Sequence, residues 1–247
     1  MEKTGVDINC DLGEGMGNEA AILPLISSCN IACGGHAGDT QSMREVVQLA
    51  KKYGVKVGAH PSYPDREHFG RISRSLPKTQ LTRSIREQIE TLLAIVGEEG
   101  MSLHHIKPHG ALYNDLVRDA DLAQTFLDAV APYTSISCLY APYGSIIAKM
   151  ALDQGIDLKY EAFADRNYRA DLSLVPRSEA NALLTEQKEV LAHLLPMIKK
   201  QEVKTVSGDT VKILADTYCI HGDTPTALEI LMYLSSSLPK HAIYILK

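Results

Sequence analysis

Residues 55–65 read VKVGAHPSYPD, and this stretch contains the unit from which the fold can be predicted. Its first half, Val55–His60, is a short apolar run with no clean alternation, which is typical of a strand covered on both faces. Pro61 follows at once and ends the run. Polar side chains gather at this point, because His60 closes the strand and Tyr63 and Asp65 follow it. The stretch therefore predicts a buried strand with polar groups at its carboxyl end.

The same unit recurs along the chain, and segments of helical period separate its copies. Strands are predicted at Val6–Asp11, Ser28–Ala32, Val55–His60, His104–Pro108, Ser135–Tyr140, Leu158–Ala164 and Ala215–His221. About seven β–α units in one chain predict an α/β fold, a single irregular β/α barrel that forms one domain over residues 1–247. A doubly wound open sheet is the alternative, since spacing alone cannot show whether the strands close into a ring.

Three local signals add detail to this outline. Asp39 is a plausible N-cap for a helix whose apolar face includes Met43 and Val47. Thr224 and Pro225 suit the N-cap and the first position of the last helix. Ser207-Gly208-Asp209 predicts the turn of a β-hairpin inserted before the last barrel strand.

Composition excludes several classes of function. The net charge is -5, and Lys and Arg form no basic stripe, which argues against nucleic-acid binding. No apolar run approaches 18 residues, so no membrane span is expected. The chain has 5 cysteines, an odd number that argues against a disulfide framework and for a reducing cytoplasm.

Ionisable residues sit repeatedly at the carboxyl end of a predicted strand or just after it. In a parallel barrel all of these ends lie on one face, which is where barrel enzymes have their active sites. Any single Asp or His in such a place is more often a cap or a satisfied core residue, and Asp39 and Asp223 could be plain helix caps. The groups that we expect to converge are Asp11, His36, His60, Lys107, His109, Asp165 and His221.

Two kinds of chemistry fit these groups. Metal-assisted hydrolysis would use a Zn²⁺ or Mn²⁺ ion with an open position, but the spacing is no local metal motif. The ligands for it would come from Asp11, His36, His60, His109 and His221. Metal-free catalysis would use Lys107 to stabilise negative charge and an Asp or His to activate water, with Arg166 holding a phosphate or carboxylate. The sequence leaves both open.

At these residues the sequence resembles the LamB/YcsF family. The resemblance rests on short strings that occur in order from about residue 5 to residue 240. They are Asp11–Glu14, Asn30–Asp39, Gly58–Asp65, Phe69–Arg71, Lys107–Asn114, Glu161–Arg166 with Tyr168, and Ala215–Thr217 through His221–Asp223. Cys29, Gly35 and the segment Asp65–His68 depart from the family pattern, which puts the shape of the pocket in doubt more than its ionisable groups.

The resemblance implies a barrel of the glycoside hydrolase/deacetylase type and the role of the A component of an ATP-hydrolysing 5-oxoprolinase. This component would work with partner subunits B and C, and would open 5-oxo-L-proline to L-glutamate with ATP, expected with Mg²⁺, as cosubstrate. The expected catalytic residues are Asp11, His60, Lys107 and His109. The expected substrate-binding residues are His36, Asp39, Tyr113, Asn114, Asp165, Arg166, His221 and Asp223, and no residue is assigned as a metal ligand.

Two other functions remain open at this point. One is a metal-dependent amidohydrolase or carbohydrate deacetylase that acts alone. The other is a non-catalytic component that binds oxoproline and delivers it to its partners. The number of ionisable groups at the predicted mouth argues against the second, since a binding pocket needs only a few.

Overall fold

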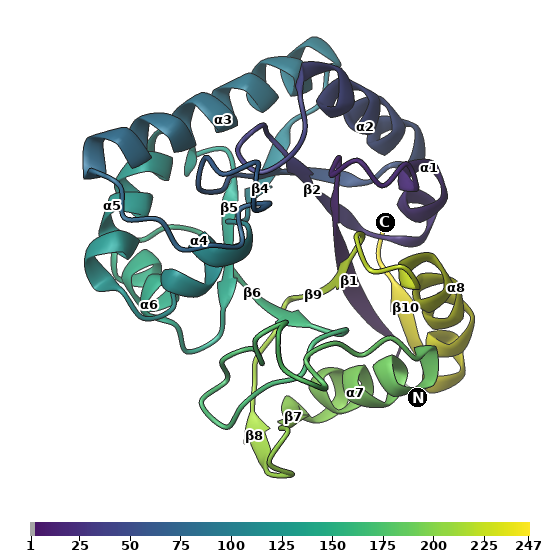
Figure 1. Cartoon of the computed structure of the whole chain (residues 1–247). Coiled ribbons are helices and arrows are strands. Elements are labelled where there is room, and N and C mark those ends of the chain that lie inside the picture. The colour runs from purple at the N-terminus through teal and green to yellow at the C-terminus, as the bar shows by residue number, and fades with distance from the viewer. Residues whose placement is uncertain (1–2) are drawn as a thin grey trace.

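A closed ring of seven parallel strands forms the centre of the computed structural model, which describes residues 3–247. Each strand pairs with the next, and the last pairs with the first, as the view down the ring in Figure 1 shows. The strands are β1 (Thr4–Leu12), β2 (Ser28–Ala32), β3 (Lys56–His60), β4 (Leu103–Ile106), β5 (Cys138–Pro142), β6 (Leu158–Phe163) and β9 (Thr217–His221). The predicted β/α barrel is confirmed, and the open sheet is wrong.

The longer helices surround the ring and cover the outer faces of the strands, and the short helix α4 (Gly110–Asp115) lies inside them (Figure 1). The other helices are α1 (Glu19–Ile22), α2 (Thr40–Tyr53), α3 (Lys78–Glu98), α5 (Ala120–Val130), α6 (Ile146–Asp153), α7 (Gln187–Lys200) and α8 (Ala227–Ser237), with 3₁₀ turns η1 (Leu23–Leu25), η2 (Ala131–Tyr133) and η3 (Leu238–His241). The predicted cap of α2 is confirmed, because the Asp39 side chain accepts a hydrogen bond from the Ser42 amide at 2.8 Å. The Ser42 hydroxyl accepts one from the Asp39 amide in return.

Several predicted boundaries differ from the structure by one to three residues, and hydrogen bonds explain two of them. The last helix begins at Ala227 and not at Pro225, because the amide of Thr224 donates to the carbonyl of His221 and forms a turn first. The strand expected at Ser135–Tyr140 begins at Cys138, because the amide of Ser137 still donates to Tyr133 in the preceding helical turn. Local hydrogen bonds at these two junctions therefore override the apolar pattern.

Two small β elements lie outside the ring. The predicted hairpin is confirmed as antiparallel strands β7 (Glu202–Lys204) and β8 (Thr210–Lys212). The sequence pattern missed β10 (Ile243–Ile245), which pairs in parallel with the start of β1. In the part of the chain that the structure describes, no helix has the length and apolar character needed to cross a membrane.

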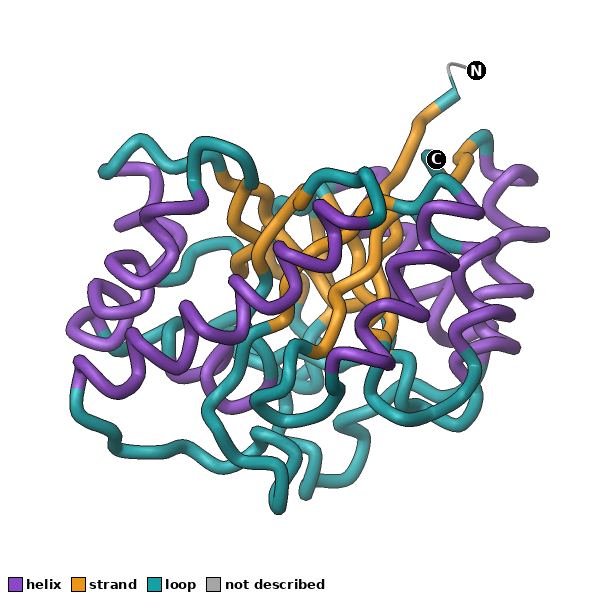
Figure 2. Tube along the Cα trace, turned by 90° about the horizontal axis from the view of Figure 1, so that it is seen from above, coloured by secondary structure: helices purple, strands orange, loops and turns teal. Residues whose placement is uncertain are grey.

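The inside of the ring is polar, although the core outside it is apolar. Side chains along β1 alternate, so that Ile8 and Cys10 join the apolar core while Asn9 makes buried hydrogen bonds to neighbouring strands. The longer loops follow the carboxyl ends of the strands and gather at the end of the barrel away from both chain termini (Figure 2). The carboxyl ends of the seven barrel strands meet at this end, and we call it the mouth.

Candidate active site

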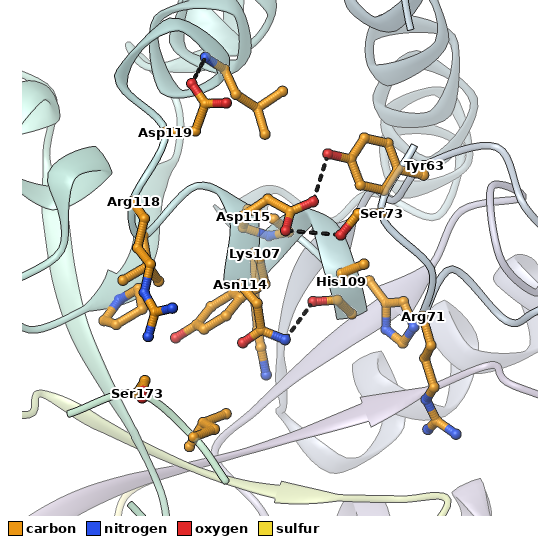
Figure 3. A pocket seen from close by; sticks show the side chains of 18 of the residues that line it. Tyr63, Arg71, Ser73, Lys107, His109, Asn114, Asp115, Arg118, Asp119 and Ser173 are labelled. Carbon is orange, nitrogen blue, oxygen red and sulfur yellow. Dashed lines mark hydrogen bonds between the residues drawn. The ribbon is translucent and has the colours of Figure 1, made fainter. Parts of the chain in front are cut away.

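A cavity of about 1420 Å³ opens at the mouth. Six of the seven barrel strands contribute to its wall, through residues at their carboxyl ends or in the loops that follow, and Figure 3 shows Lys107, His109 and Asn114 beside it. Eight of the residues predicted from the sequence line it together: Asp11, His60, Lys107, His109, Tyr113, Asn114, Arg166 and His221. The convergence expected from the strand ends is therefore present for these side chains.

Lys107 lies at the floor of the cavity between two carboxylates. Its Nζ atom is 2.9 Å from Asp11 Oδ1 and 2.9 Å from Glu161 Oε1, and all three side chains are almost fully buried. Burial alone would lower the pKa of Lys107, but Asp11 and Glu161 raise it well above its usual value. Burial would likewise raise the pKa of Asp11, yet His60 and Lys107 hold it well below its usual range. The floor therefore carries a fixed ammonium and an ionised Asp11 carboxylate at neutral pH.

Hydrogen bonds from inside the barrel hold Asp11 in place. Asn30 Nδ2 donates to Asp11 Oδ1 and to Asn9 Oδ1, each at 2.7 Å. His105 Nε2 lies 2.6 Å from Asn30 Oδ1, which orients the amide so that its nitrogen faces Asp11. Gly58 makes room for this histidine, since a Cβ there would lie 2.1 Å from His105 Nε2. His105 is thus connected to the floor through Asn30.

A cluster of three histidines and one carboxylate borders the floor on the side of β1–β4. His60 Nδ1 is 2.8 Å from the carbonyl oxygen of Lys107, and His60 Nε2 is 3.0 Å from His109 Nδ1. The rings of His36 and His109 stack with centroids 3.6 Å apart, and His36 Nε2 is 2.9 Å from Glu14 Oε1. We call Glu14, His36, His60 and His109 the histidine cluster.

Burial sets the charge states within this cluster. It lowers the pKa of His36 and of His109 well below the usual value, and the neighbouring histidines lower both further. It raises the pKa of Glu14 well above its usual value, as do Asp11 and Asp223. His36 and His109 are therefore neutral imidazoles at neutral pH, the form that can bind a metal ion.

Asp165 and His221 form a pair on the opposite side of the floor. Asp165 Oδ2 accepts a hydrogen bond from the His221 amide at 2.9 Å, and His221 Nδ1 lies 3.0 Å from both carboxylate oxygens. The imidazole also stacks on the Phe163 ring, with centroids 5.2 Å apart. Asp165 therefore holds the orientation of His221, and only His221 reaches the cavity wall.

Arginines form the outer rim of the cavity. Arg71 and Arg177 both contact the carboxylate of Asp223, Arg177 at 3.7 Å, and Figure 3 shows Arg71 and Arg118 at the rim. Arg166 is more buried, and it donates to the carbonyls of Val175 and Ala182. The six arginines that line the cavity are Arg71, Arg74, Arg118, Arg166, Arg169 and Arg177. In a chain with a net charge of -5, this concentration favours an anionic ligand.

The other predicted residues lie outside this wall or face away from it. Asp39 caps α2 and is exposed, which is the plain capping role that its position also allowed. Asn114 lines the cavity, but its amide donates to the Gly110 carbonyl at 3.1 Å within α4. Asp223 reaches the rim only through its arginine partners, and His36 lies behind His109 in the cluster.

Sequence reasoning did not select four polar residues that the structure places at the floor, beneath it or in the histidine cluster beside it. Glu14 and Glu161 occur in the strings that carried the family resemblance, so the residues were visible but had no assigned role. Asn9 and Asn30 are buried amides within strands β1 and β2, and a buried amide in an apolar run is the signal that could have identified them. Gly35, a departure from the family pattern, faces Gln88 and Ser62 so closely that a Cβ would lie 2.3–2.4 Å from their side-chain oxygens.

Comparison with known proteins connects this site to one family. A model of the LamB/YcsF family matches residues 6–247. The crystal structure of a lactam utilization protein from Thermus thermophilus is 35% identical, with a TM-score of 0.92 over 98% of this chain and 99% of that one. A family 4 carbohydrate esterase from Streptomyces lividans matches at 12% identity and a TM-score of 0.44, over 99% of this chain and 93% of the other.

Proposed function

Because the chain belongs to the LamB/YcsF family, we propose that it opens the lactam ring of 5-oxo-L-proline as the A component of an ATP-dependent 5-oxoprolinase. The similarity to a lactam utilization protein supports a cyclic amide as the substrate. The observation that carries the proposal is one cavity with an acid–base floor at Asp11, Lys107 and Glu161 and an arginine rim above it. Such a cavity suits a small substrate that carries negative charge.

The chemistry of the ring explains why ATP is needed. A five-membered lactam is an unstrained amide, so hydrolysis is slow and weakly driven. Transfer of a phosphoryl group from ATP to the lactam oxygen polarises the ring carbon. One water then adds to that carbon, the carbon–nitrogen bond breaks, and the nitrogen takes a proton; a second water releases phosphate from the acyl phosphate. We propose ATP with Mg²⁺ as cosubstrate, and subunits B and C as partners.

The contacts suggest a division of roles among the residues. Asp11 orients the attacking water and accepts its proton, and His60 lies 3.5 Å from this carboxylate on the same cavity wall. Lys107 acts as a fixed positive charge that stabilises negative charge as it develops on the substrate. It reaches a substrate oxygen directly only by exchanging a partner, because its nitrogen already lies within 3.4 Å of Asp11, Glu161 and Asn9.

The anionic groups of the substrate are assigned to the rim. Arg166 was expected to bind them, but its Nε and Nη2 atoms hold the carbonyls of its own loop. Arg71 and Arg177 are more exposed and share one carboxylate, so each retains donors for a phosphate or a carboxylate. Five unpaired cysteines fit the reducing cytoplasm that we propose as the location.

A metal-dependent amidohydrolase that acts alone is the second candidate, and the histidine cluster is the observation that favours it. The two functions differ in their requirements. The first needs ATP and partners, and the second needs neither but loses activity when a chelator removes the metal.

The test is glutamate release from 5-oxo-L-proline by the full chain, with and without ATP and with and without the B and C proteins. Our proposal predicts release only in the complete mixture, with one ADP formed per glutamate. Lys149→Met serves as a control, because Lys149 is exposed on α6 and pairs only with Asp153. Release at the full rate without ATP would contradict the proposal and support the second candidate.

A further inference from the structure

The hydrogen bonds of two buried histidines determine which of their ring nitrogens carry hydrogen. A carbonyl oxygen can only accept, so His60 Nδ1 donates to the Lys107 carbonyl at 2.8 Å. For the same reason, His109 Nε2 donates to the Phe69 carbonyl at 2.9 Å. Neither His60 Nε2 nor His109 Nδ1 is needed as a donor to these carbonyls, so both nitrogens can offer a lone pair to a cation.

These two lone pairs face each other 3.0 Å apart in a buried site. Two acceptors at that distance repel unless a positive species lies between them. Carboxylates surround the gap, because Glu14 Oε1 is 3.5 Å from His109 Nδ1 and Asp11 Oδ2 is 3.5 Å from His60 Nε2. The site therefore gathers lone pairs and negative charge around one small volume.

A metal ion satisfies more of these groups than a shared proton does. A proton between the two nitrogens would satisfy only those two atoms, whereas a metal ion would also take Glu14 Oε1, 3.5 Å from His109 Nδ1, as a ligand. Zinc ligands lie about 2.0–2.2 Å from the ion, so in a tetrahedron they stand roughly 3.3 Å from one another. The measured separations of 3.0 and 3.5 Å are close to this value. Histidines that bind metals also commonly donate their second N–H to a backbone carbonyl, as both of these do.

We propose that His60 Nε2, His109 Nδ1 and Glu14 Oε1 bind one divalent first-row transition metal, with a fourth position open to the cavity. Two imidazoles and one carboxylate form a donor set typical of catalytic zinc. His36 is assigned a positioning role and not a ligand role. Its ring is parallel to that of His109, with 3° between the planes, so the two stacked rings cannot both point at one ion. Its Nε2 instead lies within hydrogen-bond distance of Glu14 Oε1, at 2.9 Å.

This inference goes beyond the proposed function and does not depend on it. At its open position the ion would bind water or a carbonyl oxygen, and it would act as a Lewis acid. The nearest carboxylate outside the ligand set is Asp11, which would remain free to orient that water. A second group, Asp11, Cys219 and His221, also places donor atoms together, but Lys107 contacts both Asp11 and Cys219 there. That ammonium disfavours a second cation.

The test measures Zn²⁺ binding by the full chain after chelator treatment and dialysis. The expected result is one ion per chain. We expect His109→Gln and Glu14→Gln to weaken binding more than about 1,000-fold, and His36→Asn about 10–100-fold, the range for residues that orient ligands. His241→Gln is the matched control, since His241 lies in η3 outside the cavity wall, and its affinity should equal that of the unchanged chain.

Thermal melting shows whether each variant is folded. If the variants are not folded, X-ray absorption of the zinc-loaded unchanged chain identifies the ligands of the ion. Two imidazole nitrogens with oxygen in the remaining positions support the site. A sulfur ligand would place the ion at Cys219 and overturn the proposal. The absence of stoichiometric binding, or wild-type affinity in a folded His109→Gln chain, would overturn it as well.

Discussion

The two sides of the mouth are built in different ways. The histidine cluster follows strands β1–β4, is almost fully buried, and is fixed by short contacts to backbone carbonyls. The opposite side is the loop of residues 164–186 after β6, where Arg169 and Arg177 are partly exposed and held by ion pairs. We call this loop the arginine side. In the function that we propose, bond-making chemistry belongs to the rigid side, and capture of an anionic substrate to the adjustable side.

The largest effect is expected where the two sides share a floor. Lys107→Met leaves Asp11 and Glu161 as buried carboxylates without a cation. This should cost about 3–5 kcal/mol of folding free energy and lower kcat on the order of 1,000-fold. Denaturant unfolding and glutamate release in the complete mixture measure the two effects. If the variant kept the stability and turnover of Lys149→Met, the floor would have no part in either.

A change on the histidine side should affect turnover more than binding. His60→Gln removes a group that contacts both Asp11 and His109. We expect kcat to fall about 100-fold or more while KM for 5-oxo-L-proline stays within roughly twofold. Steady-state kinetics beside His241→Gln measures this. A rise in KM with unchanged kcat would show that His60 contributes to substrate binding, and would contradict the proposed difference between the two sides of the mouth.

A change on the arginine side should show the reverse pattern. Arg177→Gln removes one of two guanidinium groups that share Asp223. A partly exposed charged contact contributes on the order of 1–2 kcal/mol, so KM should rise about tenfold with little change in kcat. Arg83→Gln, on the exposed face of α3, is the control. Equal kinetics for the two variants would show that the rim does not bind substrate.

The smallest effect concerns the support beneath the arginine side. His193 on α7 stacks near Tyr168, and burial lowers its pKa to about 4. The unfolded chain, with an ordinary histidine pKa near 6.5, binds this proton more readily than the folded chain does. The stabilisation is therefore complete above pH 6.5 and is lost as pH falls toward 4, by about 2 kcal/mol between pH 7 and 5.

Unfolding free energies at these two pH values measure the effect. His193→Gln should lose less stability than the unchanged chain over the same interval. An identical pH dependence in both chains would show that His193 does not carry it.

The sequence predicted the parts of the mouth that depend on strand ends alone. Asp11, His60 and His221 are the last or next-to-last residues of their strands, so a parallel barrel brings them to the same end. Their partners depend on closure of the ring. Asn30 meets Asp11 through the β1–β2 register, and no local pattern fixes that pairing in advance.

The contacts of the arginine side could not be predicted from the sequence for a similar reason. Its residues come from a long loop whose path is set by hydrogen bonds to its own carbonyls, such as those from Arg166. Asp39 shows the opposite case, because its capping role depends only on Ser42 three residues later. Local chemistry was therefore predictable, and contacts across the ring were not.

The most direct test of the central claim is the turnover of Asp11→Asn in the complete mixture with ATP and the B and C proteins. Asp153→Asn, an exposed change on α6, provides the matched control. The account predicts a folded Asp11→Asn chain with kcat lowered on the order of 1,000-fold and a control that equals the unchanged chain. Full turnover by Asp11→Asn would mean that the lactam is opened elsewhere.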